Sequence, residues 1–186
     1  LNLCVRNLEN ISALDKINKD TLLADVCLAA LHEGAAIRGD HGQYQQTNDS
    51  SQLCTMLARS FADIGDIIRG KDLFRGNDEE KKRREKLENN LKTIFKKIYE
   101  ELKNGKTNSA LQARYDGDGD NYYKLREDWW YINRKDIWKA IRCSAPTDAD
   151  YFIKTACGTG RGTHGYCRCI NYDVPTYFDY VPQYLR

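Results

Sequence analysis

The stretch VPTYFDYVPQYLR, residues 174–186, carries the strongest indication of the fold of this chain. It contains four aromatic residues and two prolines, and it follows a glycine-rich segment with three closely spaced cysteines, Cys157, Cys167 and Cys169. Buried aromatic rings and cystines are what a small extracellular domain uses to fix its framework. Because proline is favoured in the first turn of a helix, Pro175 predicts the start of a further helix here.

Cysteine usage extends this interpretation to the whole chain. The sequence has seven cysteines, all of them disulfide candidates, at Cys4, Cys27, Cys54, Cys143, Cys157, Cys167 and Cys169. This number and scatter are typical of an oxidising, extracellular compartment. Seven is odd, so we expect one free thiol or one partner outside this sequence, and about 105 pairings remain open.

Composition sets limits on the class of protein. The 186 residues are 41% apolar, which is enough for one domain or two small subdomains with a real core. The formal net charge is only +2, so any site for an anionic partner must be a local patch. No stretch approaches the roughly 18 apolar residues of a membrane span, and we expect membrane attachment only through a larger parent protein.

Helical periodicity predicts four main helices. The first covers residues 22–37, with Asp20 or Thr21 as its N-cap, and the second runs from Gln52 to a stop at Gly70. The third begins at a capping pair of Asn77 and Glu80 and presents one apolar stripe. The fourth is aromatic, covers residues 122–141 as one helix or a pair, and should form the densest part of the core.

The intervening segments are expected to be irregular. Polar loops are predicted over residues 39–51 and 104–121, and no convincing strand pattern is present. The fold class is therefore all-α, a disulfide-tied helical bundle with long irregular loops. We expect a helical-bundle subdomain over residues 1–142, followed over 143–186 by a disulfide-tied loop region that leads into the first helix of a next subdomain.

The third helix carries the candidate binding residues. Eight basic side chains could bind a polyanion such as a sulfated glycan: Lys81, Lys82, Arg83, Arg84, Lys86, Lys92, Lys96 and Lys97. The segment 78–106 contains ten basic but also seven acidic residues, several in favourable i,i+4 pairs. An ordinary solvated helix face is the alternative to a glycan site.

The sequence gives little support for a metal site or for catalysis. Asp116, Asp118, Asp120 and Glu127 resemble a calcium loop, but Asn121 replaces its glycine, so a flexible acidic loop is preferred. Cys157, His164, Cys167 and Cys169 could suggest zinc, yet their spacing favours disulfides. With only His32, His41 and His164 and no catalytic signature, we expect no enzyme, no metal and no cofactor.

Three motifs together resemble a known family. They are ARSFADIGDIIRG at 58–70, WWYINRKDIWKAIRC at 129–143 and VPTYFDYVPQYLR at 174–186. The chain resembles, nearly end to end, the Duffy-binding-like domain of malaria-parasite adhesins, specifically the alpha type of the variant erythrocyte membrane protein one family. The resemblance implies a helical middle subdomain with its approach to the third, and it implies that the leading subdomain is absent.

The resemblance also implies a function. The parent protein of such a domain is displayed on the extracellular face of the infected erythrocyte membrane, under antigenic variation and recognition by host antibodies. Its alpha-type domain contributes to adhesion and rosetting through a host glycan or protein receptor, with a sulfated glycosaminoglycan such as heparan sulfate as the expected ligand. Ligand contacts vary within the family, so no binding residue is carried over.

Two alternatives remain open from the sequence. The chain could be a structural framework whose binding site lies in other parts of the domain. It could also be a basic module for nucleic acid, but stacking on bases needs exposed aromatic rings beside the basic helix, and the tryptophans here are expected in the core. We therefore expect no nucleic-acid partner.

Overall fold

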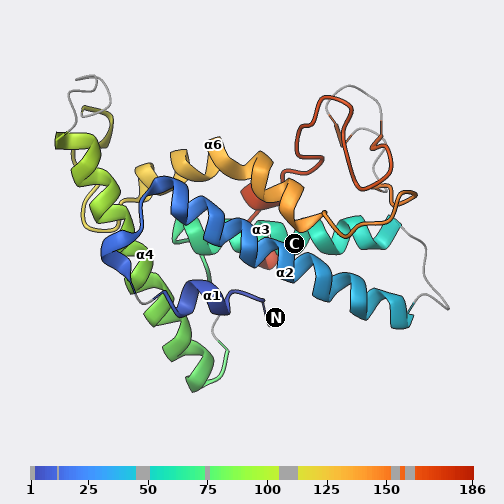
Figure 1. Ribbon diagram of the computed structural model, residues 1–186, viewed down its shortest axis with the longest axis horizontal. Coiled ribbons are helices and arrows are strands. Elements are labelled where there is room, and N and C mark those ends of the chain that lie inside the picture. The colour runs from blue at the N-terminus through green and yellow to red at the C-terminus, as the bar shows by residue number, and fades with distance from the viewer. Residues whose placement is uncertain are drawn as a thin grey trace.

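A computed structural model describes residues 3–11, 13–44, 51–73, 76–104, 113–151, 156–157 and 162–186 (Figure 1). Its α-helices are α1 (Arg6–Glu9), α2 (Lys19–Tyr44), α3 (Ser51–Arg69), α4 (Asp78–Asn104) and α6 (Tyr123–Ile141). Short 3-10 helices are η1 (Leu14–Lys16), η2 (Phe178–Tyr180) and η3 (Gln183–Leu185). Among these described residues the only β-type pairing is an isolated bridge between His164 and Arg168, so the predicted all-α class is confirmed.

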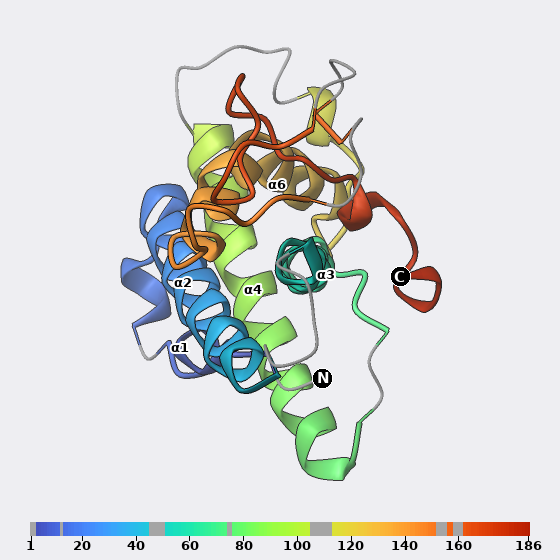
Figure 2. The same ribbon diagram turned by 90° about the vertical axis from the view of Figure 1, so that its right-hand side faces the viewer.

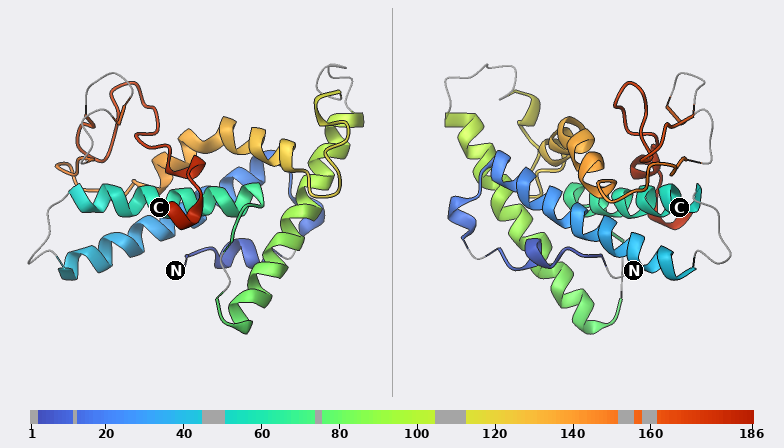
Figure 3. Two further views of the ribbon diagram at one scale, coloured as in Figure 1. Left: turned by 180° about the vertical axis from the view of Figure 1, so that it is seen from behind. Right: turned by 45° about the vertical axis from the view of Figure 1, so that its right-hand side comes forward.

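Three long helices form a bundle, and the fourth crosses its end. α6 packs along α2, and α3 packs against both, while α4 runs obliquely past them (Figures 1 and 2). In the rear view α3 lies in front of α2, so these two helices occupy opposite broad faces (Figure 3). The fully buried rings of Phe61 and Trp130 pack against each other in this core, tilted by 42° with 5.0 Å between their centroids.

α3 is the central helix of the fold. Nearly every residue from Ser60 to Arg69 is buried, because α2, α6 and the C-terminal segment cover it on different sides. Gly65 allows the close approach of Trp130, whose ring would lie 2.7 Å from a Cβ at that position. Gly70 ends the helix with a φ of 71°, a left-handed value that glycine adopts at low cost, which confirms the predicted stop.

α2 is longer than the sequence indicates. Its N-cap is Asn18, whose Oδ1 accepts the backbone N–H groups of Asp20 and Thr21 at 3.0 and 2.9 Å, so the predicted caps Asp20 and Thr21 are wrong by two or three residues. The helix also continues through Gly34 and Gly39 to Tyr44, where a loop was expected. Gly34 is present for packing, since any Cβ there would overlap the carbonyl oxygen of Ile141 on α6.

α4 and α6 follow their predicted patterns. Asn77 and Glu80 form the predicted capping box, with Glu80 N–H donating to Asn77 Oδ1 at 2.9 Å and Asn77 N–H donating to Glu80 Oε2 at 3.1 Å. The predicted apolar stripe of α4 is buried at Leu87, Leu91, Ile94, Phe95 and Ile98. The aromatic segment forms one helix, α6, with Trp129, Trp130 and Trp138 in the core as expected.

The C-terminal region folds back on α3. α6 ends at Ile141, and the helix expected at Pro175 does not form. η2 and η3 replace it, because other partners take the backbone groups of its first turn. The Thr176 hydroxyl accepts the N–H of Phe178 at 3.1 Å, and the Thr176 carbonyl oxygen accepts from Arg134 at 3.0 Å. Val181, which precedes Pro182, is extended at φ −95° and ψ 132°. Among the described residues, no helix combines the length and the apolar character needed to span a membrane.

Candidate functional site

The candidate surface lies on α4, which extends beyond the bundle at both ends (Figure 3). Between Lys81 and Lys97 the sequence holds eight basic residues and only two acidic ones, Glu85 and Glu88. Acidic residues gather instead in the first turn of the helix, at Asp78, Glu79 and Glu80. The middle of α4 therefore concentrates the positive charge of a chain that is almost neutral overall.

Helical geometry divides the eight basic candidates among three sides of α4. Since each residue advances by about 100°, Lys82, Lys86 and Lys96 lie opposite the buried stripe, and all three are exposed. Lys81, Arg84 and Lys92 line a groove toward α3 and α6. Arg83 lines a hollow on the other side, where helical spacing also places the half-buried Lys97. We name the exposed group Lys82, Lys86 and Lys96 the outer basic face.

The groove beside α4 has a volume of about 940 Å³ and a mixed lining. Four carboxylates line it, at Asp72, Asp78, Glu85 and Glu88, against three cations, at Lys81, Arg84 and Lys92. Arg84 Nη1 lies 3.5 Å from Asp72 Oδ2, and Lys92 Nζ lies 3.9 Å from Glu88 Oε1. Such a lining does not favour a polyanion, so the groove and the outer basic face differ in chemistry.

Arg126 of α6 fixes the groove wall from inside. Its fully buried guanidinium donates to both carboxylate oxygens of Glu88, at 2.8 and 2.9 Å, and to the carbonyl oxygens of Ile67 and Ile68 at 2.9 and 2.6 Å. This bidentate arrangement is the strong form of an ion pair. It neutralises Glu88, so one of the two acidic residues between Lys81 and Lys97 does not oppose anion binding.

A second hollow of about 710 Å³ separates α4 from the N-terminal segment. Arg83, Arg6 and His32 line it together with the carboxylates of Glu9 and Glu80. The thiol of Cys4 also lines this hollow, and burial beside Glu33 raises its pKa. The positive and negative side chains in this hollow are again interspersed, and nothing among them singles out a ligand.

The acidic loop acts as a helix cap. Asp118 Oδ1 accepts the backbone N–H of Lys124 at 2.8 Å, and Oδ2 accepts that of Leu125 at 3.0 Å, so this carboxylate stabilises the first turn of α6. Within the described ranges, no group of three or more His, Cys, Asp or Glu side chains is arranged to hold a metal ion. The resemblance of residues 116–127 to a calcium loop thus has a simpler structural explanation.

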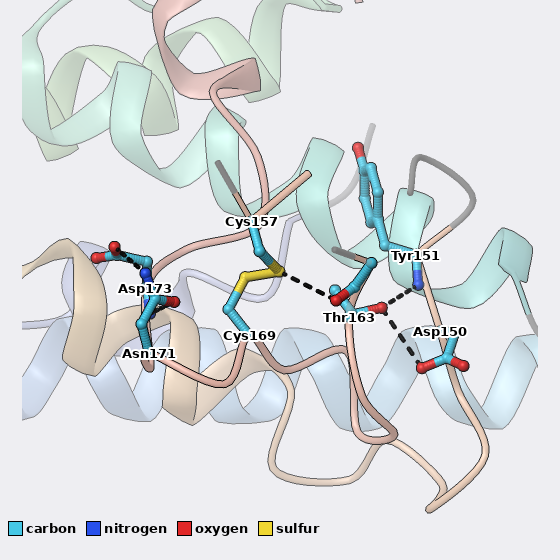
Figure 4. The surroundings of a disulfide bond; sticks show 8 residues. Asp150, Tyr151, Cys157, Thr163, Cys169, Asn171 and Asp173 are labelled. Carbon is cyan, nitrogen blue, oxygen red and sulfur yellow. Dashed lines mark hydrogen bonds between the residues drawn. A yellow bond between two sulfur atoms is a disulfide. The ribbon is translucent and has the colours of Figure 1, made fainter. Parts of the chain in front are cut away.

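Four of the seven candidate cysteines form disulfides. Cys54 of α3 pairs with Cys167, and Cys157 pairs with Cys169 within the C-terminal region (Figure 4). These bonds occupy the sulfur atoms that a zinc site would need. The Thr163 hydroxyl strengthens the same region by accepting the N–H of Tyr151 at 2.6 Å (Figure 4).

Cys4, Cys27 and Cys143 carry free thiols, which is more than the single one expected. Their surroundings differ, because Cys4 lies beside Glu33 of α2 and Cys27 beside Asp136 of α6. Cys143 is exposed just beyond the end of α6. The structure thus leaves these three cysteines outside its two disulfides.

A buried ionic network, which the sequence analysis missed, attaches the C-terminal segment. Asp179 accepts hydrogen bonds from Trp130 Nε1 at 2.8 Å and from Arg134 Nε and Nη2 at 3.0 and 2.9 Å. Next to it, Arg69 donates to the Asp179 carbonyl oxygen and Arg186 pairs with Asp66. Burial raises the pKa of Asp66, against the opposing effect of the two arginines.

One signal could have revealed this network. The acidic residues Asp63 and Asp66 interrupt an otherwise apolar run in α3, and Arg134 lies inside the aromatic helix. Charged residues at such positions are seldom buried unless they are paired. Because these charged side chains are buried and bonded to one another, the network holds the C-terminal segment against α3 and α6.

Comparison with known proteins places this geometry in a family. The family model described as the Duffy binding domain matches residues 1–186. Among solved structures, the NTS-DBL1(alpha-1) domain of Plasmodium falciparum membrane protein 1 (PfEMP1) from the varO strain is 45% identical. It matches 98% of this chain and superposes with a TM-score of 0.77.

Two beta-type domains are more distant. The ICAM-1-binding DBLβ domain of PfEMP1 IT4var13 is 30% identical over 99% of this chain, with a TM-score of 0.69. A DBLβ domain of PfEMP1 bound to human ICAM-1 is 29% identical over 97% of this chain, with a TM-score of 0.68. A comparison with curated proteins finds no match.

The matched structures are longer than this chain, which spans 39% of the varO chain and 39% and 36% of the two DBLβ chains. The match covers all the described helices, including the three motifs that suggested the resemblance. The chain therefore belongs to the Duffy-binding domain family, as its resemblance to alpha-type Duffy-binding-like domains predicts.

Proposed function

We propose that this chain is part of an adhesin domain that binds host receptors from the extracellular face of the infected erythrocyte membrane. The support is its membership of the Duffy-binding domain family, together with two DBLβ relatives that bind ICAM-1. Domains of this kind act as binding modules rather than enzymes. Receptor binding is thus the general role, and the ligand of this chain is the finer part of the proposal.

For the ligand we favour a sulfated glycosaminoglycan bound along the outer basic face. The observation that carries this choice is the arrangement of Lys82, Lys86 and Lys96, which are exposed together opposite the buried stripe of α4. Lys82 and Lys96 are 14 positions apart in the sequence, which corresponds to roughly 21 Å along the helix axis. A linear polyanion can contact such a row of cations at several points, and its binding should weaken with salt.

Heparin chromatography with paired variants tests this assignment. Lys82→Glu with Lys96→Glu reverses two charges of the outer basic face, and Lys19→Glu with Lys124→Glu reverses two exposed lysines elsewhere. Both control sites lie in the first turn of a helix, where glutamate is favourable. Each double variant lowers the formal net charge of +2 by four, so the two proteins are matched in overall charge.

We expect the Lys82/Lys96 variant to elute from heparin at clearly lower salt than the control variant, and to bind intact red cells less. Equal elution of the two variants would show that retention follows net charge alone and would refute the glycan site. Loss of heparin retention in the Lys82/Lys96 variant with red-cell binding intact would instead favour a protein receptor and a site away from α4.

A framework role without a site of its own is the second candidate. It is favoured by the burial of Phe61 and of the three tryptophans of α6, which places these landmark rings in the core and not on a binding surface. Under this alternative the folded chain shows no salt-sensitive retention on heparin at all. The same chromatography therefore separates the two candidates.

A further inference from the structure

α2 has two apolar faces, and only one of them is buried in the bundle. Leu22, Val26 and Ile37 belong to the buried face. On the opposite side of the helix four exposed apolar residues follow one another: Ala24, Leu28, Leu31 and Ala35. Leu28 is 41% exposed and Leu31 is 38% exposed. A helix that is apolar on both sides is normally covered on both sides, so this stripe indicates a further packing partner.

The spacing of the stripe identifies the geometry of that partner. Successive members are four, three and four residues apart, which is the heptad seam through which two helices pack. The order Ala, Leu, Leu, Ala reads the same in both directions. Two antiparallel copies of α2 would therefore place Leu28 of one copy against Leu31 of the other, and Ala24 against Ala35, with the small alanines at both ends of the contact.

Charge supports the same arrangement. Asp20 precedes the stripe and Arg38 follows it, and both are exposed. In an antiparallel pair centred between residues 29 and 30, Asp20 of one helix and Arg38 of the other lie at the same end, about 2 Å apart along the axis. Each end of the contact would then carry one ion pair between Asp20 and Arg38, whereas a parallel pair of helices would place like charges together.

The neighbouring helix extends the apolar surface. Asp136 of α6 lies close enough to Cys27 of α2 to influence its pKa, and Ile132 is one turn before Asp136. Ile132 is 73% exposed. In Figure 1 α2 runs along the front of the molecule with α6 beside it, so no described segment covers this broad face.

We propose that this chain forms a two-fold symmetric dimer in which α2 packs antiparallel against α2 of a second copy. A self-complementary surface is what a two-fold interface requires, because the same patch serves on both subunits. Two leucines and two alanines per subunit make a small contact, so the dimer is weak and depends on concentration. Dimerisation would present two outer basic faces in one particle and raise the avidity for a polyvalent receptor.

Sedimentation velocity of the oxidised 186-residue chain over a wide concentration range tests the dimer. We expect a reversible monomer–dimer equilibrium that Leu28→Glu weakens at least tenfold, because the change buries a charge at the centre of the contact. Leu73→Glu is the matched control, since Leu73 is 63% exposed but lies in the α3–α4 connection. Circular dichroism checks that each variant remains folded.

A charge exchange tests the antiparallel arrangement itself. Asp20→Arg alone and Arg38→Asp alone should each weaken the dimer, because like charges then meet at both ends. The double variant Asp20→Arg with Arg38→Asp should restore it, since the ion pairs are re-formed with reversed signs.

Four results would overturn the proposal: a monomer at every concentration, equal weakening by Leu28→Glu and Leu73→Glu, no rescue by the double exchange, and a dimer that disappears in a polypeptide as long as the solved relatives. The last result would assign the stripe to another segment of the same polypeptide. None of these measurements involves heparin, so the tests of the dimer and of the glycan site are independent.

Discussion

Asp179 shows how a single carboxylate can hold two distant parts of the chain together. Its side chain is fully buried, and its oxygens accept hydrogen bonds from Trp130 and from two nitrogens of Arg134 on α6. The guanidinium of Arg134 also donates to the carbonyl oxygen of Thr176 at 3.0 Å. A buried charge is stable only when its partners satisfy it in this way, so the network depends on each of its members.

We predict that Asp179→Ala destabilises the protein by about 3–5 kcal/mol, because Arg134 would be left buried without its counter-ion. Asp136→Ala is the control. It removes a carboxylate from an exposed ion pair with Lys139, at 2.7 Å, and should change the stability by less than about 1 kcal/mol. Urea denaturation followed by tryptophan fluorescence measures both. Similar small losses in the two variants would show that the network contributes little.

Cys27 provides a prediction about pH. Burial, with a contribution from Asp136, raises the pKa of Cys27 to about 11 from a reference value of 9.0. Only the thiolate reacts, so a rise of about two units lowers the reactive fraction near pH 8 by roughly 100-fold. The alkylation rate of Cys27 should therefore increase about tenfold per pH unit until the pH approaches 11.

Iodoacetamide labelling read by mass spectrometry measures this rate. At pH 8 the exposed Cys143 should be modified well before Cys27, and the difference should disappear in urea, where burial is lost. Fast modification of Cys27 in the folded protein would contradict the burial described for this thiol.

At the scale of elements, two glycines of α2, Gly34 and Gly39, have opposite roles. Gly34 lies against the backbone of Ile141 on α6, where a Cβ would overlap the carbonyl oxygen. Gly39 has no neighbouring atom within 4 Å of the position of a Cβ. The same residue type in the same helix is thus required for packing at one position and is not required at the other.

We predict that Gly34→Ala destabilises the protein by roughly 1–3 kcal/mol, because α2 and α6 must separate to admit the methyl group. Gly39→Ala should stabilise it by about 0.5–1 kcal/mol through the higher helix propensity of alanine. Thermal unfolding followed by circular dichroism compares the two variants. A stabilising effect of Gly34→Ala would show that the two helices are not in close contact there.

At the scale of the whole molecule, the two disulfides constrain the chain very differently. Cys54–Cys167 joins α3 to the C-terminal region across 113 residues, whereas Cys157–Cys169 closes a loop of 12. Removing the first pair with alanines should cost roughly 4–5 kcal/mol, and removing the second about 3 kcal/mol, since the entropy of loop closure grows with loop length. The midpoints of urea unfolding for the two double variants test this order. The reverse order would mean that local packing outweighs loop entropy.

The sequence predicted the helices that carry a strong local signal. The capping box at Asn77 and Glu80, the buried stripe of α4 and the stop at Gly70 depend on residues close together in the chain, so they could be predicted from spacing alone. The extension of α2 through Gly34 could not, because the reason for that glycine lies on another helix. The helix predicted at Pro175 was wrong, because the Thr176 hydroxyl and Arg134 of α6 bind backbone groups that its first turn would use.

The candidate site was also predictable from the sequence only in part. Their concentration in α4 was evident from the sequence, but the separation of Lys82, Lys86 and Lys96 from Arg84 and Lys92 depends on Asp72, Glu88 and Arg126. By itself the sequence determined the class of fold, the main helices and the family, because local periodicity and closely spaced motifs specify them. Only the tertiary structure decided which cysteines pair, which cations stay exposed and how Asp179 is satisfied, since these depend on residues distant in sequence that meet only when the chain folds.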